Sequence, residues 1–233
     1  MRIPGWLHDL ASVIYPDRCP VCGCTLAAGE HTLCLKCFAE LPRTGIHTSG
    51  FNEIHRRTAH RTHIERAAAF FHYERHSPYS RLIHLAKYRN RPRIAEELAE
   101  TYAREIAPSG FFDGIGMIEP VPLHWLRQIA RGYNQSMYIA YGISAATGIP
   151  VGDHLRASRL QRSQTHRSAQ ARHRAAEGLY HAVYTEELQG QHILIVDDVI
   201  TTGSTVRACC NAIAAASPDT RCSILALSLS RND

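Results

Sequence analysis

The chain has 233 residues, of which 45% are hydrophobic, and a formal net charge of +5. This length and apolar fraction suit one α/β domain of ordinary size with a small additional module. No apolar run is long enough to span a bilayer, and His8 and Asp9 interrupt the stretch that a signal peptide would need, so we expect a cytoplasmic protein without membrane insertion.

The first segment, residues 1–42, is expected to form a separate small module. Residues 5–14 have apolar side chains on one side of a helical projection, and Pro16 follows them. This pattern predicts a short amphipathic helix that ends at the proline. We expect that helix to pack on the rest of the module rather than on a membrane.

Four cysteines organise the remainder of this module. Cys19 and Cys22 form one C-x-x-C knuckle, Cys34 and Cys37 form another, and eleven residues separate the two. Four thiolates at this spacing can surround one tetrahedral ion, which predicts a structural Zn²⁺ in a zinc ribbon. The alternative is two disulfide bonds, which require an oxidising compartment, and nothing in the sequence indicates export.

The next segment, residues 43–66, is basic and rich in Gly, Ser, Thr and His, which predicts a linker or an irregular hairpin. From residue 67 to residue 233, strand-like and helix-like patterns alternate. The expected order is a strand at 66–74, helices at 79–89 and 94–107, a strand and turn at 114–124, a helix at 136–148, and strand, helix and strand within 191–230. This alternation predicts a mostly parallel sheet with helices on both faces.

One loop in this domain carries the strongest chemical signal. The run Ile193–Val196 is long enough for a buried strand, and apolar residues recur at helical spacing from Ser204 onward. The polar stretch Asp197–Thr205 then joins a strand's carboxyl end to a helix's amino end, where unpaired N–H groups bind anions. Because carboxylates accept hydrogen bonds from sugar hydroxyls, the loop predicts a sugar-phosphate site. The alternative is an ordinary turn whose polar side chains cap the helix.

This loop resembles the signature of the type I phosphoribosyltransferases for 5-phosphoribosyl 1-pyrophosphate (PRPP). The resemblance implies that Asp197 and Asp198 face the ribose 2′ and 3′ hydroxyls, with Mg²⁺ accompanying the pyrophosphate. In the purine-salvage branch, the position that resembles Thr201 is an aspartate that takes a proton from the base. Thr201 cannot take that proton, so a purine base is not the expected acceptor. The residues implied to wrap the 5′-phosphate are Thr201, Thr202, Gly203, Ser204 and Thr205.

Three features together resemble the ComF competence family, a type I phosphoribosyltransferase domain behind a zinc ribbon. They are the double knuckle, "LAKYRNRP" at 85–92 and "PVPLHWLRQIARGYNQS" at 120–136. The resemblance implies a role in natural transformation or in the use of incoming DNA, with competence machinery proteins as partners. It also makes Arg127 and Arg131 candidates for binding the pyrophosphate, although a solvated helix face explains them equally well.

A basic arm precedes the last third of the domain. Residues 154–176 contain six arginines, three histidines and no acid, so this segment is too polar for the core. By analogy with the superfamily, residues 161–174 resemble a hood that closes over the ligand. The family's asparagine is missing just beyond, where the chain reads "ARHRAAEGLYHA". The candidates for hood or nucleic-acid contacts are Arg156, Arg159, Arg162 and Arg167.

Two classes of function follow from these features. In one, the protein is an enzyme that transfers phosphoribosyl from PRPP to an unknown acceptor, with Mg²⁺ neutralising the departing pyrophosphate. In the other, it binds single-stranded nucleic acid, nucleotides or a protein partner, and PRPP is a regulatory ligand. The intact loop argues against a vestigial site, and no residue is assigned as catalytic.

Overall fold

Four parallel strands form the central sheet of the protein, in the order β1-β6-β5-β2. The computed structural model describes residues 17–58, 64–88, 91–123, 128–129, 131–158 and 178–231, so the helix predicted at 5–14 lies outside the described residues. The predicted mostly parallel sheet is confirmed. The strands of this sheet are β1 (Ile64–Tyr73), β2 (Met117–Pro120), β5 (His192–Ile200) and β6 (Arg221–Ser230).

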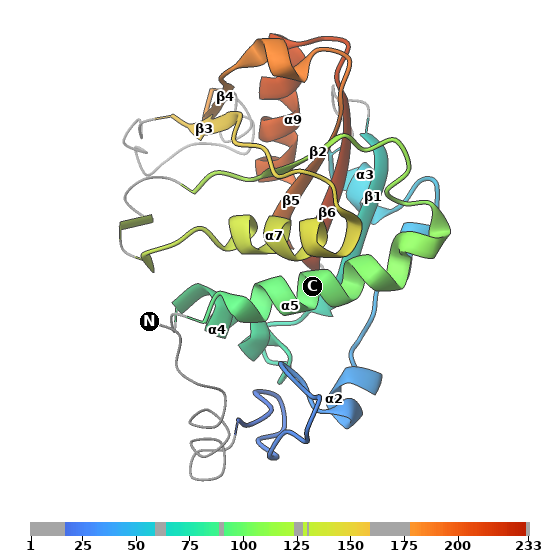
Figure 1. The fold of residues 1–233 in the computed structure, drawn as a ribbon, viewed down its shortest axis with the longest axis vertical. Helices are drawn as coiled ribbons and strands as arrows, with labels where there is room; N and C mark the ends of the chain where they lie inside the picture. The colour runs from blue at the N-terminus through green and yellow to red at the C-terminus, as the bar shows by residue number, and fades with distance from the viewer. Residues whose placement is uncertain are drawn as a thin grey trace.

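Helices cover both faces of this sheet, as the alternating pattern predicts (Figure 1). Helices α4, α5 and α7 bury their apolar sides against one face, and α3 and α9 bury theirs against the other. The helices of the domain are α3 (Glu53–Thr58), α4 (Ser80–Tyr88), α5 (Arg93–Ile106), α7 (Gln135–Thr147) and α9 (Ser204–Ala216), with short 3-10 turns η1 (Ile46–Thr48), η2 (Ala107–Ser109) and η3 (Thr185–Leu188).

The inner strand β5 supplies side chains to both hydrophobic layers. Ile193 and Ile195 pack in the cluster that contains α9, whereas Leu194 and Val196 pack in the cluster that contains α5 and α7. Successive side chains of a strand point to opposite faces, so a strand covered on both sides is apolar at every position. This is why the sequence shows a continuous apolar run immediately before the two aspartates.

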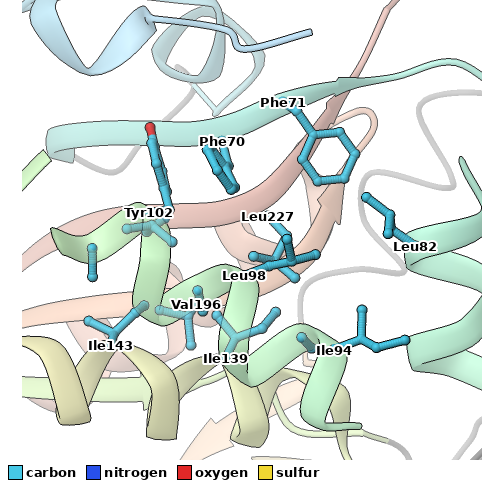
Figure 2. Packing of buried hydrophobic residues seen from close by; sticks show 14 of the residues in the cluster. Phe70, Phe71, Leu82, Ile94, Leu98, Tyr102, Ile139, Ile143, Val196 and Leu227 are labelled. Carbon is cyan, nitrogen blue, oxygen red and sulfur yellow. The ribbon is translucent and has the colours of Figure 1, made fainter. Parts of the chain in front are cut away.

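The larger of these clusters centres on aromatic and aliphatic side chains from β1, α5 and α7 (Figure 2). The ring of Phe70 stacks on that of Tyr102 with their centroids 4.6 Å apart. The Tyr102 hydroxyl donates a hydrogen bond of 3.0 Å to the carbonyl oxygen of Ala69, which satisfies its one polar atom inside the core. Each such fully buried large side chain stabilises the fold by about 1.5–3 kcal/mol.

The segment at residues 43–58 is structured, contrary to the expected linker or irregular hairpin. It contains η1 and α3, and Ile54 in α3 is fully buried in the cluster around α9. The side-chain amide of Asn52 donates hydrogen bonds to the carbonyl oxygens of Ile46 and Ala67, at 3.0 and 2.7 Å. One buried isoleucine and one buried asparagine anchor this basic stretch, a signal too small for the sequence pattern to reveal.

The amino-terminal module packs against α4 and α5 (Figure 1). Its helix α2 (Leu35–Ala39) is followed by Leu41, which is buried in the same cluster as the α5 side chains. The Tyr79 hydroxyl donates to the Cys37 carbonyl oxygen at 3.1 Å, and the Arg43 guanidinium stacks over the rings of Phe38 and Phe70. In the part of the chain that the structure describes, no helix is long and apolar enough to cross a membrane.

Candidate functional site

The four cysteines of the two knuckles meet at one point. The sulfur atoms of Cys19, Cys22, Cys34 and Cys37 all lie within 4.8 Å of one another. Tetrahedral zinc with Zn–S bonds of about 2.3 Å places its sulfurs about 3.8 Å apart, so a small contraction closes the cluster around the ion. The donor set and its geometry therefore fit structural zinc.

Local backbone hydrogen bonds bend each knuckle toward this point. In the first, the Gly23 amide donates to the Cys19 carbonyl oxygen at 2.8 Å, and Gly23 has a φ of 78° that favours glycine. In the second, Cys34 is the N-cap of α2, and its sulfur accepts from the Cys37 amide at 3.5 Å. Cys24 lies near the cluster, with its sulfur 3.3 Å from that of Cys22.

The two aspartates lie at the carboxyl end of β5 and not in the following loop. Strand β5 continues to Ile200, so the loop before α9 is shorter than the predicted stretch from Asp197 to Thr205. Pairing with β6 extends the strand, because Asp197 lies opposite Ala226 and the Asp198 carbonyl oxygen accepts a hydrogen bond from Ser228. Polar residues continue a strand here because the neighbouring strand provides the backbone partners.

Asp197 is held by hydrogen bonds and is electrostatically unfavourable when ionised. Its Oδ1 accepts from the backbone amide of Asp198 at 2.8 Å and from the hydroxyl of Ser136, at the start of α7, at 3.3 Å. Burial and the neighbouring Asp198 charge raise the pKa of Asp197 from 3.8 to about 7, against smaller lowering effects that include Lys87. The site therefore contains a carboxyl group that titrates near neutral pH.

The loop from Thr201 to Gly203 is open to solvent on one side and supported by α3 on the other. Thr201 and Thr202 are exposed, and Gly203 is buried with a φ of 75°. A Cβ atom on Gly203 would lie 3.2 Å from the backbone oxygen of Arg57 in α3. The Arg57 guanidinium also donates to the carbonyl oxygens of Thr201 and, at 2.8 Å, Ser230. Glycine is thus required here by backbone conformation and by close packing of α3.

The segment just before α7 connects the loop after β2 to this site. Asn134 caps α7 through its bond with the Ser136 amide at 3.1 Å, and its side-chain amide donates to the carbonyl oxygen of Val121 at 3.0 Å. The Tyr133 hydroxyl donates to the Ala86 carbonyl oxygen in α4 at 2.6 Å. The loop after β2, helix α4 and the start of α7 are therefore fixed beside Asp197.

The predicted pyrophosphate ligands are only partly described. Arg131 lies just before α7 and donates to the side-chain oxygen of Gln135 at 3.0 Å, and Arg127 lies outside the described residues. One cation that the sequence reasoning did not single out contacts the aspartate pair directly. The Lys87 ammonium, at the end of α4, lies 3.0 Å from Oδ2 of Asp198. Lys87 belongs to the "LAKYRNRP" stretch that resembles the family, but nothing in the sequence indicates that contact.

The basic arm begins with β3 (Leu155–Ala157), which pairs antiparallel with β4 (Tyr180–Ala182) just beyond the arm, and this small pair packs near α9. The buried carboxylate of Glu119, in β2, accepts from the backbone amides of His154 and Leu155, both at 2.7 Å. Burial raises the pKa of Glu119, and these hydrogen bonds oppose the increase. Arg156 of β3 forms an exposed ion pair with Asp153 at 2.6 Å. Arg159, Arg162 and Arg167 lie outside the described residues.

Family models match two parts of the chain. Residues 133–233 match the phosphoribosyl transferase domain, and residues 10–47 match the double zinc ribbon domain. The chain is also similar, with 20% sequence identity and a TM-score of 0.40, to the glutamine phosphoribosylpyrophosphate amidotransferase from B. subtilis complexed with ADP and GMP. That similarity covers 60% of this chain and 30% of the other.

The chain is also similar to curated relatives named for DNA utilization and for competence. The DNA utilization protein YhgH of Salmonella typhi is 33% identical over 133 residues, which cover 55% of this chain and 58% of that protein. Competence protein F of Haemophilus influenzae is 36% identical over 92 residues, which cover 38% and 40%. The matched regions thus span less than two thirds of these relatives. A double zinc ribbon match ahead of a phosphoribosyl transferase domain match, in a chain with relatives so named, confirms the predicted resemblance to the ComF competence family.

Proposed function

We propose that this chain is a phosphoribosyltransferase-like protein that binds PRPP at the loop after β5. The observation that carries the proposal is the aspartate pair at the carboxyl end of an inner parallel strand, beside an open hydroxyl-rich loop and the start of α9. Ligands of open α/β sheets bind outside the carboxyl ends of the strands. The match to the phosphoribosyl transferase domain over residues 133–233 supports the same ligand class.

The ribose and the 5′-phosphate of PRPP each have complementary groups at the end of β5 and in the following loop. The carboxylates of Asp197 and Asp198 are suited to accept hydrogen bonds from the ribose 2′ and 3′ hydroxyls. The first turn of α9 has N–H groups without intrahelical acceptors, and the residues from Thr201 to Thr205 add hydroxyl donors for the 5′-phosphate. Mg²⁺ would accompany the pyrophosphate and neutralise part of its charge.

Calorimetric titration with PRPP and Mg²⁺ tests this assignment. The double variant Asp197→Asn, Asp198→Asn removes two ionisable carboxyl groups with little change in volume, so we expect it to fold and to bind PRPP at least about tenfold more weakly. The matched control is Asp219→Asn, the same chemical change at an exposed turn between α9 and β6. Unchanged affinity in the double variant would show that the site is elsewhere.

The biological role that we propose is in natural transformation or in the use of incoming DNA. It is supported by the names of the relatives, DNA utilization protein and competence protein F. We place this role in the cytoplasm, because four thiols gathered for zinc suit a reducing compartment. Competence machinery proteins are the partner class that this role implies.

A second function is binding of single-stranded nucleic acid, with PRPP as a regulatory ligand and no turnover. The six arginines within residues 154–176 and the DNA-related names of the relatives support it. Titration of single-stranded DNA with and without PRPP and Mg²⁺ tests it, together with an assay for released pyrophosphate. DNA affinity that changes with PRPP, without pyrophosphate release, favours this function. Pyrophosphate release that requires an added acceptor favours the transferase.

A further inference from the structure

Lysine is rare in this chain, and Lys87 lies in direct contact with the aspartate pair. The chain has 26 lysines and arginines together, and its sequence contains lysine only at positions 36 and 87. One of these two lysines forms the ion pair with Asp198, with Nζ 3.0 Å from Oδ2. The exposed fractions of the two side chains are 22% for Lys87 and 13% for Asp198, so the pair is partly shielded from water. An ion pair in such surroundings is stronger than one on the open surface.

This ion pair competes with the proposed ligand for a carboxylate oxygen of Asp198. The carboxylate oxygens of the aspartate pair are the proposed acceptors for the sugar hydroxyls, and one of them, Oδ2 of Asp198, already accepts from the Lys87 ammonium. In PRPP, the pyrophosphate is attached to the ribose carbon next to the one that carries the 2′ hydroxyl. Lys87 lies beside the pair of carboxylates proposed to receive the 2′ and 3′ hydroxyls, so its ammonium is also within a short side-chain movement of the pyrophosphate.

The chemistry of lysine suits such a movement. Its ammonium is a compact point charge on a flexible four-carbon stem, and it binds phosphate oxygens without the fixed geometry that a guanidinium imposes. Lys87 lies in the last turn of α4, so the stem is anchored by a helix while its charged end can turn. The partner that it would leave, Asp198, gains hydrogen bonds from the sugar in exchange.

We propose that Lys87 is a pyrophosphate-binding residue that exchanges partners: it neutralises Asp198 in the free protein and moves onto the pyrophosphate when PRPP binds. This inference rests on the proposed PRPP site. It assigns to Lys87 a ligand contact that distinguishes PRPP from ribose phosphates without a pyrophosphate. A purely structural ion pair would instead hold Asp198 in place for every ligand of the loop.

Three probes separate these roles in calorimetric titrations of the full chain with Mg²⁺: PRPP, ribose 5-phosphate and inorganic pyrophosphate. For Lys87→Met, we expect PRPP and pyrophosphate to bind about tenfold more weakly, because one charge-assisted contact is lost. Ribose 5-phosphate should bind as in the parent or more tightly, because Asp198 no longer has a competing partner. Lys87→Arg, which keeps the charge, should restore part of the PRPP affinity.

A second variant tests the exchange without removing the lysine. Asp198→Asn frees the ammonium, so inorganic pyrophosphate should bind more tightly while ribose 5-phosphate binds more weakly. The control is Arg104→Met, which breaks an exposed ion pair with Glu100 on α5 and should change none of the three affinities.

The outcomes keep the two proposals apart. Equal weakening of PRPP and ribose 5-phosphate in Lys87→Met, or no change in either, would overturn the exchange while leaving the PRPP site intact. A parent protein that binds none of the three probes would overturn the PRPP site as well.

Discussion

The cysteine cluster and the aspartate pair are assembled in opposite ways. The cluster takes all four donors from residues 19–37, and two short knuckles with local hydrogen bonds bring them together. The aspartate pair depends on groups that are distant in the sequence, Lys87 from α4 and Ser136 from α7. One site is made by local chain geometry, and the other by packing of the whole α/β domain.

This difference determines what each site tolerates. A metal that four thiolates surround supplies its own folding energy, so its site survives changes elsewhere in the protein. The aspartates depend instead on the packing of the neighbouring strands and helices, which offsets the burial and the mutual repulsion of the two carboxyl groups. We therefore expect disturbances of the first site to stay local and disturbances of the second to spread, and the following experiments test that expectation.

The largest effect should come from removing zinc. We expect one zinc per chain, and we expect a strong chelator to abolish amide-exchange protection across residues 17–42 while β5 and β6 stay protected, because metal ribbons depend on their ion for folding. Cys37→Ser should lower the zinc content, whereas Cys24→Ser, a neighbour at 3.3 Å from Cys22, should leave it unchanged. Simultaneous loss of protection in the sheet would mean that the two regions fold as one unit.

A smaller but still large effect should follow from loss of the Glu119 carboxylate. Glu119→Ala leaves the backbone amides of His154 and Leu155 without their acceptor, and each buried unpaired group costs about 1–3 kcal/mol. We expect about 3 kcal/mol of destabilisation in urea unfolding, with lost exchange protection in β3. Glu119→Gln keeps an acceptor oxygen at the same place and should cost less than about 1 kcal/mol. Equal effects of the two variants would contradict the role of these hydrogen bonds.

The same contrast explains which parts of the fold and of the two sites can be predicted from the sequence. The knuckle spacing predicts the cysteine cluster because the donors are close along the chain, and the alternating pattern predicts the parallel sheet because a buried strand is apolar on both faces. The contact of Lys87 with Asp198 and that of Arg57 with the loop after β5 are not predictable in this way. They depend on where α4 and α3 pack relative to β5 and β6, which no local pattern encodes. Strand β5 is also longer than its apolar run predicts, because polar residues extend it through pairing with β6.

The pH dependence of the stability of the protein should reveal the raised pKa of Asp197. Its pKa rises from 3.8 to about 7 because of burial and the Asp198 charge, so the folded state binds a proton more tightly than the unfolded state does. This contribution to stability is therefore present at low pH and is lost as the pH rises from about 4 through 7. The full separation is worth about 4 kcal/mol, and we expect about half of it, because relaxation and water entry reduce the cost of burial.

Asp197→Asn removes this titration and keeps a side-chain oxygen for the Ser136 and Asp198 donors. We expect the variant to be more stable than the parent at pH 8 and similar to it at pH 4, in urea unfolding at both values. Asp219→Asn, in an exposed turn, is the control for loss of one charge. A parallel pH profile for variant and parent would contradict a raised pKa at this carboxyl.

The smallest effect concerns Arg156, the one arginine of the basic arm candidates that the structure describes. Its ion pair with Asp153 is exposed, with 38% and 70% of the two side chains accessible, so Arg156→Ser should change stability by less than about 0.5 kcal/mol. The informative variant is Asp153→Asn, which removes the ion pair and leaves the guanidinium with its hydrogen bonds to the carbonyl oxygens of Asp153 and Leu155. If Arg156 contacts a phosphate backbone, loss of the ion pair should strengthen single-stranded DNA binding. It should also steepen the slope of log affinity against log salt by up to about 0.7, the contribution of one phosphate contact.

Identical salt slopes for parent, Asp153→Asn and Arg156→Ser would show that Arg156 is not part of the nucleic-acid surface. The arm's contribution would then have to come from residues beyond β3.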